Sequence, residues 1–184
     1  MEQITSFFCT NYNVTKIKFE PVNVQGRAAK NKVIAPSAEA FVKHFIRAQE
    51  IANSYGRELL YSGARFDVLT DIFCLASGSS FGITPEGYIT SCYEVLEKKN
   101  PLSGVFFYGK IEGSSIVYFP DKLKQLSKLN VFEKEKCRRC FAKFHCAGDC
   151  PAKSMLSETQ EADPNYRCII NRELTKEQLI KAIK

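Results

Sequence analysis

The chain has 184 residues, of which 45% are hydrophobic and 25% are charged. These values are ordinary for a globular protein, and they exclude a disordered or fibrous chain. The formal net charge is +6, but the basic residues are scattered, and acidic residues and cysteines interrupt the densest basic run, residues 134–139. Nucleic acid is therefore not an expected partner.

The sequence predicts neither a membrane span nor a secretory signal. No segment approaches the roughly 18 apolar residues that a transmembrane helix needs, and residues 1–11 lack a basic start followed by an apolar run. We expect a cytoplasmic chain without a membrane partner. Because thiols stay reduced in that compartment, the eight cysteines are expected to bind metal rather than to form disulfides.

Cysteine usage divides the chain near residue 70. Only Cys9 precedes this point, whereas the other seven cysteines follow it. No low-complexity segment, internal repeat or flexible linker marks another boundary. We therefore expect two domains, residues 1–70 and residues 71–184.

The first domain has the pattern of a βαβ unit. Residues 15–22 alternate between polar and apolar side chains, which is typical of a strand. Ser37 is a candidate N-cap for a long amphipathic helix that ends near Gly56, and residues 59–61 follow as a short apolar strand. Two strands and one helix cannot cover both faces of a parallel sheet, so we expect this domain to be part of a larger one.

The second domain has the pattern of short antiparallel strands and helices. A proline early in residues 84–87 and a glycine at their end predict a tight turn between the first two strands. The predicted strands are residues 80–83, 88–92, 105–110 and 115–119, and the predicted helices are residues 121–129 and 175–183.

Four cysteines of the second domain are closely spaced, as Cys137-x2-Cys140-x5-Cys146-x3-Cys150. Thiolates are the soft ligands that iron-sulfur clusters select, and a CxxC turn lets two sulfurs reach neighbouring irons of one cluster. A proline follows Cys150, as in the ferredoxin run whose last cysteine binds a different cluster from its neighbours. This pattern predicts two clusters, one held by Cys137, Cys140, Cys146 and Cys168 and the other held by Cys74, Cys92 and Cys150.

Zinc is the alternative metal. The seven cysteines and His145 would supply eight ligands, enough for two zinc ions, and zinc modules also use CxxC turns. However, His145 is adjacent to Cys146, and neighbouring residues rarely both reach one tetrahedral ion. Iron is therefore the expected metal.

The full cysteine pattern resembles a known domain. Together with the run from Cys137 to Cys150 and the later Cys168, the segment Cys74-x12-Gly87-x4-Cys92 resembles the SPASM domain of radical S-adenosylmethionine (SAM) enzymes that modify peptides and proteins. Residues 17–22, followed by Gly26-Arg27-Ala28, look like the last strands of the partial (β/α)6 barrel that precedes such domains.

The resemblance implies an α/β fold, with the C-terminal strands and helix of the barrel followed by a loop-rich α+β iron-sulfur domain. It also implies two auxiliary [4Fe-4S] clusters that bind substrate or accept an electron from it. Cys137, Cys140, Cys146 and Cys168 would hold the outer cluster, and Cys74, Cys92 and Cys150 would hold the inner one. The implied product is a modified peptide or protein, for instance with a thioether or carbon-carbon crosslink.

The family's CxxxCxxC loop, which holds the SAM-cleaving cluster, does not occur in this sequence. SAM and a third [4Fe-4S] cluster are therefore expected only in a full-length enzyme, whose N-terminal barrel would belong to the same or a separate chain. Other implied partners are a peptide or protein substrate and an electron donor or acceptor such as ferredoxin or flavodoxin.

Two departures from the family pattern refine the expectation. Some relatives supply a further cysteine shortly before the equivalent of Cys74, but Ser62 to Phe73 contains none. The inner cluster is thus expected to keep one iron open to a substrate thiolate, a water or another protein ligand. Sulfatase-maturing relatives have an aspartate after the equivalent of Cys92, where this chain has Tyr93, so sulfatase maturation is not favoured.

Two carboxylates are candidate catalytic residues. Glu20 lies in the first predicted strand and either faces the barrel interior or is a solvated or ion-paired strand end, whereas Glu94 lies near the inner cysteines in the sequence and could serve as a base. Two other functions stay open at this point. The chain could be a stand-alone electron-transfer or peptide-binding module, or a zinc-stabilised interaction domain.

Overall fold

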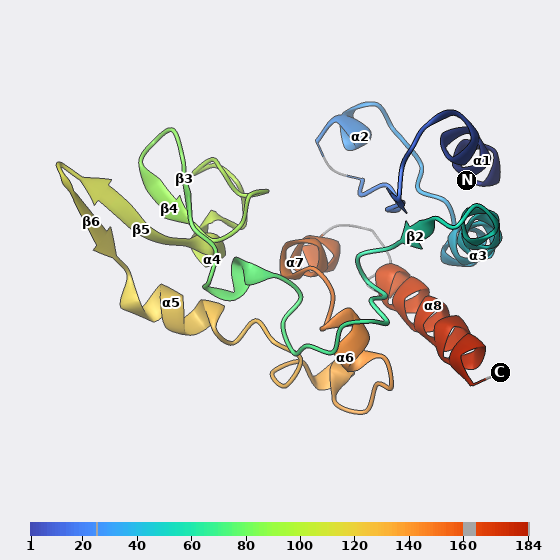
Figure 1. The fold of residues 1–184 in the computed structure, drawn as a ribbon. Helices are drawn as coiled ribbons and strands as arrows, with labels where there is room; N and C mark the ends of the chain where they lie inside the picture. The colour runs from blue at the N-terminus through green and yellow to red at the C-terminus, as the bar shows by residue number, and fades with distance from the viewer. Residues whose placement is uncertain (25, 160–164, 184) are drawn as a thin grey trace. The chain divides into compact units, whose positions relative to one another are not determined.

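The computed structural model describes residues 1–24, 26–159 and 165–183. Within them the chain forms a mixed α/β structure with eight α-helices and two small sheets (Figure 1). The predicted α/β class is therefore confirmed, while the barrel and cluster-domain architecture stays a prediction. Two compact units are present: Met1–Leu69 with Ala162–Lys184, and Thr70–Glu161. Among the described helices, none has the length and apolar character of a bilayer span.

The first unit contains the predicted βαβ arrangement. Strand β1 (Lys16–Lys18) pairs in parallel with β2 (Glu58–Leu60), and Ile17 lies opposite Leu59. Helix α3 (Ala38–Ser54) connects them. Its N-cap is Ser37, whose hydroxyl oxygen accepts a hydrogen bond from the Ala40 amide at 3.1 Å. The strands are shorter than predicted, but their parallel pairing confirms the unit.

Helix α3 forms the core of the first unit. Its apolar face packs against β2 and the helices α1 (Glu2–Asn11) and α8 (Tyr166–Ala182), as Figure 1 shows for α1 and α3. Phe41 and Phe45 are almost completely buried, and each side chain contributes roughly 2–3 kcal/mol by leaving water. The other buried residues of this core include Ala48, Ala52, Leu59, Tyr61, Ile170 and Leu174.

Three helices of the first unit differ from the prediction. Helix α1 was not predicted, because its apolar residues do not form one buried face: Ile4 and Phe7 are exposed, and only Thr5 and Cys9 are buried. The short α2 (Arg27–Lys30) was also not predicted. Helix α8 begins at Tyr166, although the sequence predicted a helix only from residue 175.

The second unit contains a four-stranded antiparallel sheet in chain order (Figure 1). Its strands are β3 (Gly82–Ile83), β4 (Tyr88–Thr90), β5 (Phe107–Glu112) and β6 (Ser115–Tyr118). In the turn between β3 and β4, the Thr84 hydroxyl accepts a hydrogen bond from the Tyr88 amide at 3.0 Å, and Gly87 has a positive φ of 77°. Both predicted hairpins are therefore confirmed.

Short helices lie before and after the strands of this sheet in the sequence. The predicted helix at residues 121–129 is present as α5 (Pro120–Leu126), whereas the expected strand start at residues 105–106 lies instead in α4 (Ser103–Phe106). Ile89, Phe106 and Leu126 form the centre of the core. The elements that the sequence did not predict are the 3-10 turns η1 (Leu75–Ser77) and η2 (Glu135–Cys137) and the helices α6 (Lys143–Cys146) and α7 (Pro151–Thr159).

We expect Gly109→Ala to destabilise the chain by about 1–3 kcal/mol, because the new Cβ overpacks the sheet. This atom would lie 2.9 Å from the Val117 carbonyl oxygen and 3.2 Å from Ile89 Cγ1. Gly104→Ala is the matched control, since no atom lies within 4 Å of a Cβ at that helical position. Urea unfolding of both variants measures the difference, and equal midpoints would contradict this packing.

Candidate metal centres

Six cysteines lie in the second unit, and none of the chain's eight cysteines forms a disulfide. Cys74 precedes η1 and is exposed, Cys92 follows β4 and is buried, and Cys150 directly precedes α7. Cys137 ends η2 and Cys146 ends α6, and both are buried. Cys140 lies between them and is partly buried. All six thus lie in turns or at helix ends.

Cys74, Cys92 and Cys150, here called the inner set, are brought together although they are distant in the sequence. Burial raises the pKa of the Cys92 thiol to about 11, and the charges of Cys150 and Cys74 add to this rise. Charges affect one another in this way only over short distances. The predicted inner ligands therefore occupy one neighbourhood of the second unit.

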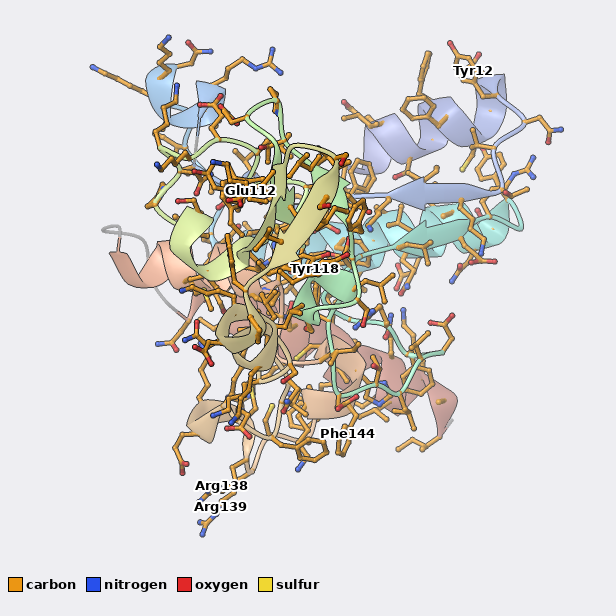
Figure 2. The ribbon with its side chains drawn as sticks, turned by 90° about the vertical axis from the view of Figure 1, so that its left-hand side faces the viewer. Tyr12, Glu112, Tyr118, Arg138, Arg139 and Phe144 are labelled. Atoms are coloured by element: carbon orange, nitrogen blue, oxygen red, sulfur yellow. The ribbon has the colours of Figure 1, made fainter. Side chains whose placement is uncertain are left out.

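Cys137, Cys140 and Cys146, here called the outer set, form a second group. Burial raises the pKa of the Cys146 thiol to about 11, and the charges of Asp149, Cys137 and Cys140 contribute in the same direction. The Cys140 amide donates a hydrogen bond to the Cys137 carbonyl oxygen at 3.1 Å, which closes the CxxC segment into a turn. In Figure 2, Arg138 and Arg139 of this turn extend away from the rest of the second unit.

The fourth predicted outer ligand, Cys168, lies on α8, which belongs to the first unit. Its membership of the outer set therefore stays a prediction. Cys9 lies on α1 in the same unit and is 7% exposed within the core around α3. Its surroundings are those of a small core residue.

A left-handed turn separates Cys146 from Cys150. Ala147, Gly148 and Asp149 have φ angles of 50°, 73° and 63°. In a continuous helix, two residues four positions apart would lie on the same face. The turn instead ends α6 at Cys146 and lets α7 begin after Cys150, so the two thiols join different sets. A left-handed Ala costs about 1–2 kcal/mol, whereas Asp tolerates this conformation better, so Ala147 is the strained residue of the turn.

Backbone amides point at one thiol sulfur in each of three segments. The amides of Glu94, Gly148 and Lys153 donate hydrogen bonds to the sulfurs of Cys92, Cys146 and Cys150 respectively, and each bond lowers the pKa of its thiol. Burial has the opposite and larger effect. Hydrogen bonds from amides stabilise a thiolate and are typical of the sulfurs around iron-sulfur clusters. The donor set and its amides thus fit such a group.

Within residues 1–24, 26–159 and 165–183, no three side chains of His, Cys, Asp or Glu are arranged to bind a metal ion. A single ion is surrounded by all its ligands, whereas in a [4Fe-4S] cluster each thiolate binds a different iron, so the ligands are further apart.

Of the two candidate carboxylates, Glu94 lies beside the inner set. Its Oε1 is 3.8 Å from Lys153 Nζ, and its negative charge raises the pKa of both Cys92 and Cys150 after the larger effect of burial. The sequence did not point to Lys153 because its relation to Glu94 depends on tertiary contact. The only sequence signal for Lys153 was its position three residues after Cys150, near the start of a helix.

Glu20 has a structural role in the first unit. Its Oε1 accepts a hydrogen bond from the Ser62 amide at 2.9 Å, and its Oε2 lies 3.8 Å from a guanidinium nitrogen of Arg167. These contacts connect the segment after β1 with the segment after β2 and with α8. They correspond to the ion-paired alternative that the sequence left open for this residue.

A cavity of about 360 Å³ lies in the second unit. It lies between the segment that leads to Cys137 and the first turns of α7, which follow Cys150. The lining residues are Lys134, Glu135, Lys136, Pro151, Ser154 and Met155. Lys134 also packs its aliphatic chain on Gly148, and its Nζ donates a hydrogen bond to the Gly148 carbonyl oxygen at 2.5 Å.

In protein without metal, we expect iodoacetamide at pH 8 to alkylate the exposed Cys74 first. Cys92 and Cys146 should react slowly, because they are buried and their pKa values of about 11 leave little thiolate at that pH. Their rates should rise about tenfold per pH unit up to pH 10. Mass spectrometry of peptides measures the order, and equal rates for the three thiols at pH 8 would contradict it.

Gly148→Ala tests the left-handed turn. The substitution should cost about 1–2 kcal/mol for the backbone conformation and more for crowding, since a Cβ would lie 3.0 Å from Lys134 Cδ. Gly113→Ala is the matched control, because Gly113 also has a positive φ but nothing lies within 4 Å of its Cβ position. Urea unfolding should show a larger loss for Gly148→Ala than for Gly113→Ala, and the reverse order would count against the turn.

Comparison with known proteins adds no assignment to this geometry. No protein-family model matches the chain, and neither a curated protein nor a solved structure is similar to it. The two cysteine sets of the second unit therefore carry the functional argument.

Proposed function

We propose that this chain is the auxiliary iron-sulfur portion of a radical SAM enzyme that modifies a peptide or protein. The inner set would hold one [4Fe-4S] cluster, and the outer set with Cys168 would hold the other. SAM, a third cluster and the reaction that generates the radical belong to an N-terminal barrel on the same or a separate chain. A peptide or protein substrate and an electron carrier such as ferredoxin or flavodoxin complete the proposal.

The observation that carries the proposal is the separation of the six cysteines of the second unit into two groups. Cys92 is affected by the charges of Cys74 and Cys150, whereas Cys146 is affected by those of Cys137 and Cys140. The sequence spacing predicted these same groups for two clusters.

The residues around the two groups support thiolate ligation. Backbone amides donate to sulfurs in both sets, and the left-handed turn directs Cys146 and Cys150 into different sets. When bound, the clusters would supply iron sites for substrate groups and a place to store an electron. The cavity lined by Lys134 and Met155 would offer space for a substrate side chain.

Iron and sulfide analysis of the anaerobically reconstituted chain tests the proposal. We expect about eight irons and eight sulfides per chain, from two [4Fe-4S] clusters, with broad visible absorption. Cys146→Ala should reduce the iron content to about four, because the outer cluster loses a ligand. Cys9→Ala is the control and should retain about eight irons, since Cys9 lies in the core of the first unit.

The same measurements distinguish the other two functions. A colourless chain with stoichiometric zinc would instead indicate a zinc-stabilised interaction domain. If the chain has full iron content but no peptide is modified when a SAM-cleaving barrel is added, it is a stand-alone electron-transfer or peptide-binding module. Adding a barrel that contains CxxxCxxC, with SAM, reductant and peptide, separates this case from the proposed enzyme.

A further inference from the structure

The inner set supplies three thiolates, whereas a [4Fe-4S] cluster has four irons to ligate. The three other cysteines of the second unit form the outer set, and residues 62–73 contain no cysteine. Of the two remaining cysteines, Cys9 lies in the core of the first unit and Cys168 is assigned to the outer cluster. The fourth ligand of an inner cluster is therefore another type of side chain, a substrate group or a solvent molecule. Carboxylate oxygen is an established ligand for protein-bound iron.

We propose that the carboxylate of Glu94 is the fourth ligand of the inner cluster and that Lys153 positions it. This inference rests on the proposed function, because it needs a cluster at Cys74, Cys92 and Cys150. It goes further by naming the ligand of the iron that these cysteines leave.

The backbone places Glu94 directly beside Cys92. The amide of Val95 donates a hydrogen bond to the Cys92 carbonyl oxygen at 3.0 Å, so residues 92–95 form a tight turn. Within this turn the Glu94 amide donates to the Cys92 sulfur. Asn100 adds a hydrogen bond of 3.4 Å from its side-chain amide to the Glu94 carbonyl oxygen. The main chain that carries the carboxylate is thus held next to an inner sulfur.

The ion pair with Lys153 orients the side chain of Glu94 toward the third inner cysteine. Lys153 lies in the first turn of α7, its amide donates to the Cys150 sulfur, and its side chain is only 22% exposed. The 3.8 Å contact of its Nζ with Glu94 Oε1 therefore joins the segments of Cys92 and Cys150. One carboxylate oxygen is sufficient to bind iron, so Oε1 can keep this ion pair while Oε2 binds.

Asp149 is the rival carboxylate, and its surroundings differ. Asp149 is buried and lies in the left-handed turn between Cys146 and Cys150, so it stands next to one thiol of each set. Glu94 instead lies in the turn that follows Cys92 and pairs with Lys153 in the segment that follows Cys150, so both of its neighbouring segments carry inner cysteines. A ligand of the inner cluster has to face the inner sulfurs together, which favours Glu94.

Lys153 also suits the charge of such a site. Three thiolates and one carboxylate bring four negative charges to the cluster, and a partly buried ammonium group reduces the cost of gathering them. Lys153 is accordingly a positioning residue that acts through Glu94. It need not touch the cluster.

The test uses the full chain, reconstituted anaerobically, with ¹³C-labelled glutamate incorporated. Pulsed EPR of the reduced protein should show a ¹³C hyperfine coupling from a carboxylate bound to iron. The coupling should be lost in Glu94→Ala and retained in Glu97→Ala. Glu97 is the matched control because it lies three residues away, is about as exposed as Glu94 (56% against 52%), and pairs with Lys99 at 2.8 Å rather than with Lys153. Lys153→Ala should weaken or broaden the coupling without reducing iron content.

A second measurement uses 2-mercaptoethanol as a probe of an open iron. In Glu94→Ala the probe should bind and shift the EPR spectrum, whereas the unchanged chain should need at least about tenfold more probe for the same shift. If the unchanged chain contains about eight irons but shows no coupling, or binds the probe as readily as Glu94→Ala, Glu94 is not the ligand. If it takes up no iron and sulfide, the proposed function fails, and this inference with it.

Discussion

The left-handed turn at Ala147, Gly148 and Asp149 is the constraint on which the arrangement of the second unit depends. Cys146 and Cys150 would share a helix face if α6 continued into α7, and one group of thiols would then contain both. Three consecutive positive φ angles prevent this. Lys134 supports the turn by donating a hydrogen bond to the Gly148 carbonyl oxygen and by covering Gly148. The separation into two sets thus follows from backbone strain that local contacts hold in place.

Two opposing effects act on the thiols that this turn separates. Burial disfavours the thiolate form and raises the pKa of Cys92, Cys146 and Cys150, whereas one backbone amide lowers the pKa of each. Burial is the larger effect in every case. Protein without metal therefore keeps these groups as neutral thiols near pH 7, and ligation has to release their protons. The amides reduce that cost because their hydrogen bonds favour the charged sulfur.

The first unit is built around a helix and two strands rather than around cysteines. Its core forms around one face of α3, and its two parallel strands pair only with each other within the described residues. Glu20 joins the segments after both strands through the Ser62 amide and Arg167. These contacts hold the segments that follow the two strands against α8.

Local signals in the sequence were sufficient for the elements that local chemistry decides. The Ser37 cap, the Gly87 turn and the alternating residues around Ile17 predicted α3, the first hairpin and β1, because caps, turns and strand periodicity act over a few residues. Helix α1 was not predicted, because its exposed aromatic residues break the periodicity that identifies a helix. Helices α6 and α7 were not predicted either, because the segment from Cys137 to Cys168, which contains both, has few apolar residues from which a helical period could be recognised.

The sequence by itself determined which residues can bind metal, since cysteine type and spacing are properties of the chain. Only the tertiary structure decided which side chains meet. The Glu94–Lys153 ion pair joins a turn after β4 to the start of α7, and nothing in the intervening sequence specifies that contact. The left-handed φ angle of Ala147 is another such feature, because alanine does not favour that conformation by itself. Packing with other segments has to stabilise it, and packing is a property of the fold.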